Sequence, residues 1–375
     1  MKLNQLKIGE KIAKLPIVQG GMGVGVSRSS LAGAVAAAGG VGIISTAQIG
    51  YDEENFEKDP AGCNLVAIKK HIKRAKEIAA DKVGNCAGLI GVNVMVALKH
   101  YREHVRAAVE AGADVVICGA GLPMDLPELV ENSTTKIAPI VSSARACKLI
   151  LKQWANKYHR TTDFIVVEGP AAGGHLGFHL DQLEEFGYVG EHDKSTIVEA
   201  HRMEQMSVDK EIEDIVALKK EYEKQFNCHI PVIMAGGVFD HEDVMHAMEL
   251  GAEGVQIASR FVATYECDAS DAYKQAYVDA DEKDIQIIKS PVGLPGRALF
   301  NKFVARVTGE KGVIKKCYQC LEKCNPAKVP YCITKALIDA VKGDIENGLI
   351  FCGANVGKIK KMMSVKDLMK ELAGE

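Results

Sequence analysis

Eight short runs of hydrophobic residues recur between residues 16 and 258, separated by stretches with helical spacing. Most runs are nearly continuous in Val, Ile and Leu, which is typical of parallel strands covered on both faces. Their alternation with helices favours an α/β fold of the (β/α)8 TIM-barrel type over an open doubly wound sheet. The predicted strands are Pro16–Gly20, Gly40–Ser45, Leu89–Val96, Asp114–Gly119, Ile137–Ser142, Phe164–Glu168, Pro231–Ala235 and Gly254–Ala258.

Capping signals mark some of the helices between these strands. Ser27 is expected to cap a helix over Leu31–Ala38, which ends at Gly39. Asp240 is expected to cap a helix over His241–Leu250. Each of these helices follows one predicted strand and leads toward the next, as a repeated βα unit requires.

Two segments depart from the strand–helix alternation. Residues 176–207 form a long polar insertion after the sixth strand, and we expect it to lie over the active face as a lid or contact arm. Residues 271–375 are expected to form a cysteine-rich C-terminal extension that packs on a barrel of residues 1–270.

The charge balance narrows the class of partner. The 375 residues carry 46 basic and 49 acidic side chains, a net charge of −3, which argues against binding to nucleic acid or an anionic membrane. No apolar run reaches spanning length, and the first residues lack the apolar segment of a signal peptide. We therefore expect a cytoplasmic protein that acts on a small molecule; a homodimer is left open.

Glycine and small polar residues follow the last two predicted strands. Barrels often bind phosphate in the loops after strands seven and eight, where glycines let backbone amides approach the ligand. A hydroxyl from Ser259 would add a donor. Phosphate binding explains both loops better than tight turns alone, and the candidate residues are Ala235, Gly236, Gly237, Gln256, Ala258 and Ser259.

The first, third and sixth strands deliver further candidates to the same face. Gly20, Gly21 and Met22 would let a flat ring lie close to the backbone. Asn93, an amide within a Val/Ile strand, fits a ligand donor better than a satisfied core amide. Glu168 is either a paired structural carboxylate or a cofactor contact, and the sequence does not separate the two.

His175 is the strongest candidate for chemistry. It lies on a glycine-rich turn after the sixth strand, directly behind Gly173 and Gly174. A histidine on such a turn can act as a general acid or base, or as a hydrogen-bond donor. A purely structural role fits this position poorly.

Four of the eleven cysteines follow one another closely in the extension, with the spacing Cys317-x2-Cys320-x3-Cys324-x7-Cys332. Four thiols at short loop spacings suit an iron–sulfur cluster or a structural zinc ion. The alternative is a set of reduced thiols in a turn-rich tail. The sequence leaves both interpretations open.

These motifs together resemble the nitronate monooxygenase (2-nitropropane dioxygenase-like) family, which also contains flavin-dependent enoyl-acyl-carrier-protein reductases. The resemblance covers residues 16–261 and implies a barrel that holds FMN non-covalently. The matching pieces are Pro16–Met22, Gly91-Val92-Asn93, Glu168-Gly169-x-x-Ala172-Gly173-Gly174-His175-x-Gly177, Ala235-Gly236-Gly237 and Gly251-Ala252-x-Gly254-Val255-Gln256.

The resemblance also implies roles for individual residues. Gly21 and Met22 would contact the isoalloxazine ring, Asn93 would hydrogen-bond to it, and His175 would be catalytic. The family's ring or phosphate contacts would fall on Gly173 and Gly174, and its phosphate site on Gly236, Gly237, Ala258 and Ser259. The sequence departs from the family pattern at Ala171, where an acid is common, and at Ala258-Ser259, which replaces Gly-Thr. The insertion and the cysteine-rich tail are a third departure, because they exceed the typical family member.

Three functions remain as predictions. The first is FMN-dependent oxidation of alkyl nitronates with O2. The second is reduction of an enoyl thioester, with NAD(P)H as reductant and an acyl-carrier protein as one form of the substrate. The third is a non-redox barrel enzyme that binds a phosphorylated metabolite. A bound iron–sulfur cluster would favour the second function, because an exposed cluster is poorly suited to a site that consumes oxygen.

Overall fold

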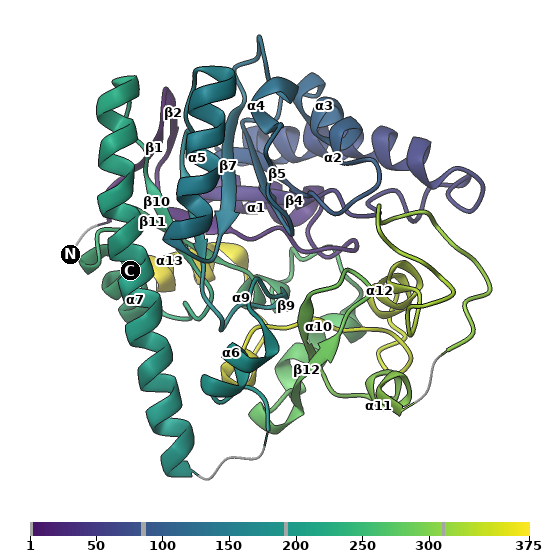
Figure 1. Cartoon of the computed structure of the whole chain (residues 1–375). Helices are drawn as coiled ribbons and strands as arrows, with labels where there is room; N and C mark the ends of the chain where they lie inside the picture. The colour runs from purple at the N-terminus through teal and green to yellow at the C-terminus, as the bar shows by residue number, and fades with distance from the viewer. Residues whose placement is uncertain (1–2, 84–87, 191–193, 310–311) are drawn as a thin grey trace.

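The structure is a computed structural model that describes residues 3–83, 88–190, 194–309 and 312–375. Eight parallel strands close into a barrel in the order β10-β11-β3-β4-β5-β6-β7-β8 (Figure 1), which confirms the predicted TIM barrel. Each strand end lies within one residue of its prediction. The strands are β3 (Ile17–Gln19), β4 (Val41–Ser45), β5 (Leu89–Met95), β6 (Val115–Gly119), β7 (Lys136–Val141), β8 (Ile165–Glu168), β10 (Val232–Ala235) and β11 (Gly254–Ile257).

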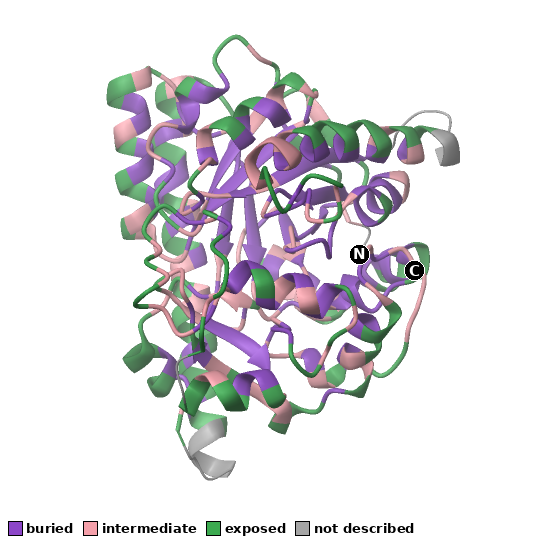
Figure 2. Cartoon of the chain, turned by 90° about the vertical axis from the view of Figure 1, so that its right-hand side faces the viewer, coloured by how far each residue is buried: buried purple, intermediate pink, exposed green. Residues whose placement is uncertain are grey.

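Helices cover the outside of the barrel, and Figure 2 shows the strands between them as almost wholly buried. The covering helices are α1 (Ser29–Ala37), α2 (Pro60–Val83), α3 (Tyr101–Glu110), α4 (Leu126–Leu129), α5 (Ala144–Tyr158), α7 (Lys194–Phe226) and α8 (His241–Glu249). This burial on both faces explains why the strands read as continuous hydrophobic runs in the sequence.

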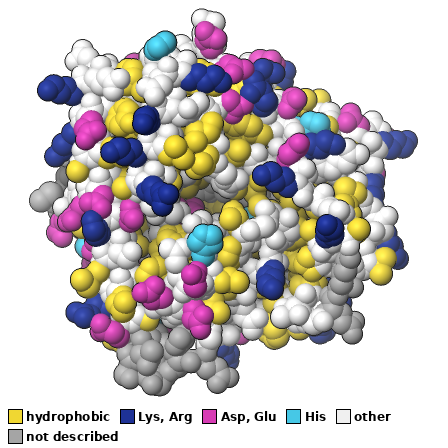
Figure 3. Space-filling view, viewed as in Figure 1, with side chains coloured by type: hydrophobic (Ala, Val, Ile, Leu, Met, Phe, Trp, Pro, Cys, Tyr) yellow, Lys and Arg dark blue, Asp and Glu magenta, His cyan; other side chains and the backbone are white. Residues whose placement is uncertain are grey.

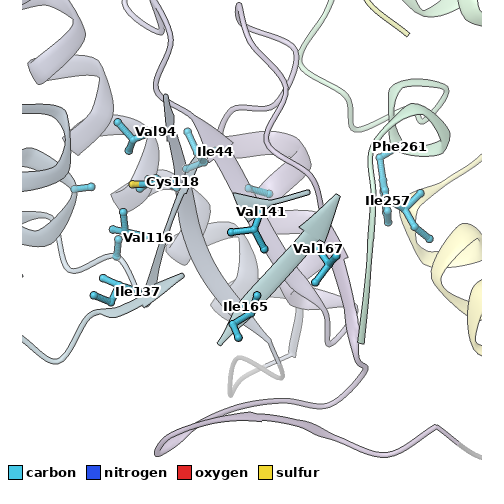
Figure 4. Packing of buried hydrophobic residues seen from close by; sticks show 14 of the residues in the cluster. Ile44, Val94, Val116, Cys118, Ile137, Val141, Ile165, Val167, Ile257 and Phe261 are labelled. Atoms are coloured by element: carbon cyan, nitrogen blue, oxygen red, sulfur yellow. The ribbon is translucent and has the colours of Figure 1, made fainter. Parts of the chain in front are cut away.

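Successive side chains of a strand point to opposite sides. In β6, Val115 and Ile117 fill the barrel interior with Phe164. Val116 and Cys118 belong to the larger cluster between the strands and the helices (Figure 4). The barrel therefore has two hydrophobic layers, one inside the strands and one outside them.

A short hairpin precedes the barrel. It consists of β1 (Leu6–Ile8) and β2 (Lys11–Ala13), which pair antiparallel. Its apolar side chains belong to the interior cluster of the barrel. The hairpin therefore closes one end of the barrel, and the opposite end remains for ligands.

The two predicted helix caps have different outcomes. The Asp240 side chain accepts a hydrogen bond from the Asp243 amide at 3.1 Å, so this cap is confirmed. The Ser27 cap is wrong, because α1 begins at Ser29 and the Ser27 hydroxyl accepts a hydrogen bond from Met22 N–H at 2.8 Å. The Asp268 carboxylate instead accepts hydrogen bonds from three amides at the start of α1, a contact across 240 residues that no local pattern predicts.

The role of residues 176–207 as a lid or contact arm stays a prediction. The first part of this insertion contains α6 (Leu180–Glu185), and its last part, residues 194–207, is the beginning of the long helix α7. Residues 191–193 lie outside the described residues. Leu176 and Leu183 pack with Ile287 of the extension, and Gly177 is the one described residue of the insertion that lines the main cavity.

The C-terminal extension packs on the barrel and completes it. Its last helix, α13, contacts α1, α8 and α9 (Ser259–Val262) and so occupies the place of the eighth barrel helix. A three-stranded antiparallel sheet joins two extension strands to β9 (Gly174–His175) of the barrel loop. The elements of the extension are α10 (Asp271–Asp279), η1 (Glu282–Asp284), β12 (Ile285–Lys289), β13 (Pro295–Leu299), α11 (Lys302–Gly309), α12 (Ile333–Val341), η2 (Val356–Lys358) and α13 (Val365–Ala373).

Basic and acidic side chains are interspersed over the face seen in Figure 3, which agrees with the small net charge. Of the helices that the structure describes, none has both the length and the apolar character required to cross a membrane.

Candidate active site

A cavity of about 440 Å³ opens at the carboxyl ends of the barrel strands. This is the end at which βα barrels place their active sites, and the volume is ordinary for a small-molecule pocket. The cavity brings together every residue that the sequence predicted for ligand contact: Gly20, Gly21, Met22, Asn93, Glu168, Gly173, Gly174, His175, Ala235, Gly236, Gly237, Gln256, Ala258 and Ser259.

The turn that carries His175 is held by the C-terminal extension. His175 pairs with Gly296, and Gly174 pairs with Arg297, in the antiparallel ladder between β9 and β13. The Leu176 amide donates a hydrogen bond to the Pro295 carbonyl at 2.9 Å. A glycine-rich turn would otherwise be free to move, so this ladder fixes the position of His175 against the cavity.

The His175 ring lies among uncharged groups. Its Nε2 is 2.6 Å from the Ser290 hydroxyl, and its ring meets the Phe351 ring edge-on at 4.9 Å between centroids. Burial lowers the pKa of His175 to about 4, so the imidazole is neutral at physiological pH. Within the described residues, Nδ1 has no hydrogen-bond partner.

Two hydroxyl groups lie behind His175. The Ser290 oxygen, which faces Nε2 of His175, also accepts a hydrogen bond from the Val292 amide at 3.3 Å. The Tyr331 hydroxyl donates to the carbonyl of Lys289, the residue before Ser290, at 3.3 Å. These contacts fix the side of the imidazole that carries Nε2.

Arg297 is a fully buried cation beside this turn. Its Nη1 donates hydrogen bonds to the carbonyls of Pro170 and Ala172, in the loop that leads to His175. Its guanidinium carbon lies 4.1 Å from the centroid of the Tyr188 ring. Burial lowers the Arg297 pKa, and its Nε and Nη2 have no partner in the described part of the chain.

Glu168 ends β8 at the cavity wall. Burial raises its pKa to about 7, although the charge of Arg297 acts in the opposite direction. In the described part of the chain, its carboxylate makes no hydrogen bond or ion pair. Of the two interpretations left open by the sequence, this geometry favours a ligand contact over a paired structural carboxylate.

Two features of the cavity wall fit a bound flat ligand. A side chain at Gly21 would place its Cβ 2.4 Å from the Asn93 Cβ, so only glycine allows this wall. The side-chain oxygen of Gln256 is buried without a partner in the described residues. A buried acceptor left unpaired is costly, and a ligand donor would satisfy it.

The predicted phosphate loops lie together under the extension. Gly236 and Gly237 have φ values of 86° and 88°, a backbone conformation that other residues rarely adopt. The Ser259 hydroxyl accepts a hydrogen bond from Gly353 N–H at 2.9 Å and retains its own proton for a ligand. Asn355 donates to the Gly237 carbonyl at 2.6 Å, so the extension covers both loops.

The sequence missed the residues that the extension contributes to the site. No pattern in the sequence showed that residues 295–299 pair with the His175 turn. An arginine directly after a proline and a glycine, Pro295-Gly296-Arg297, was the available signal. The missed residues of the extension that line the cavity or hold its wall are Tyr273, Tyr277, Ser290, Leu294, Arg297, Leu337, Phe351, Cys352, Gly353 and Asn355.

The four spaced cysteines do not form a single-ion site. Among the described residues, no three His, Cys, Asp or Glu side chains are placed to hold one metal ion. Cys317, Cys320, Cys324 and Cys332 are free thiols. Cys352 is separate from them and lines the main cavity, where burial raises its pKa to about 12 and keeps it protonated.

A comparison with known families identifies the barrel. The family model described as nitronate monooxygenase matches residues 5–375. The chain belongs to the nitronate monooxygenase family. It is a flavin-dependent oxidoreductase, and the glycine-lined cavity at the strand ends is the place where the fold offers room for the flavin.

Curated relatives and solved structures agree with this membership. A probable nitronate monooxygenase of Bacillus subtilis (strain 168) is 24% identical over 385 positions, which cover 96% of this chain and 95% of the relative. The structure of FabK from Thermotoga maritima matches with a TM-score of 0.67 at 24% identity, over 96% of this chain and 92% of that one. The nitroalkane oxidase from Streptomyces ansochromogenes also has a TM-score of 0.67, at 19% identity, over 97% and 96% of the two chains. These two structures share the fold of this chain.

Proposed function

We propose that this chain is an FMN-dependent enzyme that oxidises alkyl nitronates, or the nitroalkanes that form them, with O2. The observation that carries the proposal is the neutral imidazole of His175, with Nδ1 unpartnered in the described residues, on the wall of a cavity shaped by glycines. A base in this position is suited to removing a proton from a weak carbon acid.

FMN fits the residues of this cavity. The close approach of Gly21 to Asn93 leaves a flat wall for the isoalloxazine ring, and the unpaired Gln256 oxygen can accept a hydrogen bond from it. Gly236, Gly237 and Ser259 would hold the phosphate. When bound, FMN supplies the transfer of electrons from the substrate to oxygen.

The protein's own contribution is proton transfer in a site with little water. Nδ1 of His175 would take the proton from the carbon next to the nitro group, and the imidazolium formed would stabilise the anionic oxygens of the nitronate. Ser290 holds the ring through Nε2, which leaves Nδ1 for the substrate. Burial strengthens these charge interactions because the local dielectric is low.

The second candidate is an NAD(P)H-dependent enoyl thioester reductase, with an acyl-carrier protein as one carrier of the substrate. The sequence resemblance includes such enzymes, and the fold is shared with FabK. In this reaction His175 would orient the thioester or return a proton to it after hydride transfer. The same cavity and the same histidine serve both candidates, so the difference lies in the substrates that the enzyme accepts.

The experiment that tests the proposal uses protein loaded with FMN. Oxygen uptake is measured with an alkyl nitronate, and NADH or NADPH oxidation is measured without oxygen in the presence of a crotonyl thioester. Oxygen uptake without enoyl reduction supports nitronate oxidation; enoyl reduction alone supports the second candidate. A protein that binds no FMN would overturn both.

With a neutral nitroalkane as substrate, replacing His175 by Ala should lower kcat by about a hundredfold or more, since a positioned general base contributes at least that factor. The wild-type kcat/KM should be constant above pH 5 and fall as His175 becomes protonated near pH 4. A variant rate within a few-fold of the wild type would remove His175 from the mechanism.

A further inference from the structure

A second cavity of about 250 Å³ lies where residues 316–320 of the extension meet the beginnings of α2 and α3. Its polar lining includes Glu57, Lys58, Asp59, His100, His104 and Gln319. Among the described residues, none lines both this second cavity and the main one. Sites for drug-sized ligands have volumes of about 300–1,000 Å³, so the second cavity offers room for a small ligand only.

The extension is held firmly at this cavity. The Tyr318 ring stacks on the Phe56 ring, with 5.7 Å between the ring centroids. The Glu322 amide donates a hydrogen bond to the Ala97 carbonyl at 3.0 Å, directly after the residues that line the cavity. These contacts fix one wall of the second cavity against the barrel.

The two carboxylates in the lining already have donors within the protein. The Glu57 carboxylate accepts hydrogen bonds from Lys316 and from the Tyr318 hydroxyl, the latter at 3.1 Å. The Asp59 carboxylate accepts a hydrogen bond from the Gly62 amide at 2.9 Å, in the first turn of α2. Neither carboxylate therefore needs a cation from outside.

Three exposed or half-exposed groups of the lining have no partner in the part of the chain that the structure describes: Lys58 Nζ, the His100 ring and Gln319 Nε2. Gln319 uses only its side-chain oxygen, which accepts a hydrogen bond from Lys99 Nζ at 2.6 Å. Each of the three free groups can donate a hydrogen bond. A ligand that satisfies them must therefore present acceptors.

His104 supplies the observation that points to a ligand inside the cavity. It lines the cavity from α3, its side chain is only 3% exposed, and its Nδ1 is buried without a partner in the described residues. Burial lowers the His104 pKa to about 4, so the ring is neutral and one of its nitrogens carries a proton. A buried polar atom left unpaired is costly, and a ligand that meets this ring would remove the cost.

Two helices begin at the second cavity. Pro60 and Ala61 in its lining open α2, which has 24 residues. His100 is the N-cap residue of the 10-residue helix α3, and its side chain makes no capping hydrogen bond. The amino ends of helices carry partial positive charge, and Lys58 adds a full one. The electrostatic potential and the free donors therefore favour the same kind of ligand.

We propose that the second cavity binds a small anion through its oxygen atoms, as inorganic phosphate or a short carboxylate presents them. His104 would contact the anion inside the cavity, and Lys58, His100 and Gln319 would donate to it from the exposed side. Ala47 lines the main cavity and the next residue, Gln48, lines the second one. The anion would therefore lie behind the loop that follows β4.

The test measures the binding of phosphate and of malonate to the full chain by isothermal titration calorimetry, with chloride at the same ionic strength as the reference. The chain is loaded with FMN, so that the glycine loops of the main cavity are not free to bind phosphate. Lys58→Ala removes an exposed donor, and His104→Phe removes the buried ring nitrogens. Lys73→Ala is the matched control, because Lys73 is an exposed lysine of α2 that does not line the cavity.

At least one of the two anions should bind to the wild type and to Lys73→Ala with a Kd of about 1 mM or below. Lys58→Ala and His104→Phe should each weaken this binding by about tenfold, since hydrogen bonds to a charged ligand are stronger than those between neutral groups. A wild type that binds neither anion would overturn the proposal, and so would equal binding by Lys58→Ala and the wild type.

Two checks keep the result specific to the second cavity. Thermal unfolding shows whether His104→Phe is folded; if it is not, the exposed substitution Lys58→Ala decides alone. If the chain takes up no FMN, the proposed oxidoreductase function fails, and the comparison of Lys58→Ala with the wild type on FMN-free protein still decides the anion site.

Discussion

At the scale of single residues, the site depends on groups whose ordinary protonation or pairing has been changed by burial. His175 is neutral because its surroundings disfavour the imidazolium form, and Glu168 holds its proton up to about pH 7 for the same reason. Both residues line one cavity, so their unusual pKa values mark it as functional. Two predictions follow from their contacts.

Ser290→Ala should lower kcat about fivefold with a small change in KM, because the lost hydrogen bond to Nε2 is of the order of 1 kcal/mol and no longer fixes the ring. Ser290→Thr keeps the hydroxyl and should restore most of the rate. Steady-state kinetics of both variants check this. Equal rates for the Ala variant and the wild type would show that Ser290 does not position His175.

Glu168→Gln should remove a pH dependence of stability. The folded-state pKa of Glu168 is about 7 against an ordinary value of 4.5, so the carboxyl stabilises the fold fully below pH 4.5. That contribution is lost as pH rises toward 7. In chemical denaturation between pH 4.5 and 7.5, the free energy of unfolding of the wild type should therefore fall more steeply than that of the variant. If the free energy of unfolding changed equally with pH in the wild type and in the variant, a group other than Glu168 would cause the pH dependence.

At the scale of elements, the decisive contact is the pairing of β13 with β9. A parallel barrel supplies the strand that leads to the turn, but the turn itself is held by a strand more than 110 residues further along the chain. Arg297 strengthens the contact by donating to two carbonyls of the approach loop. The sequence predicted the barrel strands from their hydrophobic runs, whereas two-residue β9 has no such run and could not be predicted.

Arg297→Met should lower the free energy of unfolding by about 2–4 kcal/mol, since the Pro170 and Ala172 carbonyls lose their buried donor. It should also lower kcat, because the His175 turn is less firmly held. Arg297→Lys keeps the positive charge and part of the hydrogen bonding. Its free energy of unfolding and its kcat should therefore lie between those of the wild type and those of Arg297→Met. Thermal unfolding and kinetics on the same samples check this; a stable Met variant with full activity would contradict it.

At the scale of the whole molecule, the barrel is closed by residues from the end of the chain. Leu368 and Met369 of α13 are buried in the main hydrophobic core beside α1 and α8. The extension therefore serves as wall of the cavity and as the missing barrel helix. We expect the extension and barrel to unfold together, although the boundary at residue 270 remains a prediction.

Leu368→Ala should cost about 2–5 kcal/mol of stability, as other large-to-small changes in a packed core do. Lys366→Ala on the exposed face of the same helix is the matched control and should change stability by less than about 0.5 kcal/mol. For each of the two variants, denaturation followed by flavin fluorescence and denaturation followed by circular dichroism should give coincident transitions. Separate transitions would show that the extension unfolds independently.

The sequence alone determined the barrel and its strand ends, because parallel strands buried on both faces are continuous runs of hydrophobic residues. It also determined the set of residues that meet in the cavity, because the carboxyl ends of all barrel strands lie at the same end of the barrel. It could not determine the wall contributed by the extension, the hydrogen bond between Ser290 and His175 or the cap that Asp268 provides for α1. Each of these depends on contacts between residues far apart in the chain, and such contacts leave no periodic pattern. Only the tertiary structure brings Ser290 and Arg297 to the His175 turn and buries the imidazole, which keeps it neutral.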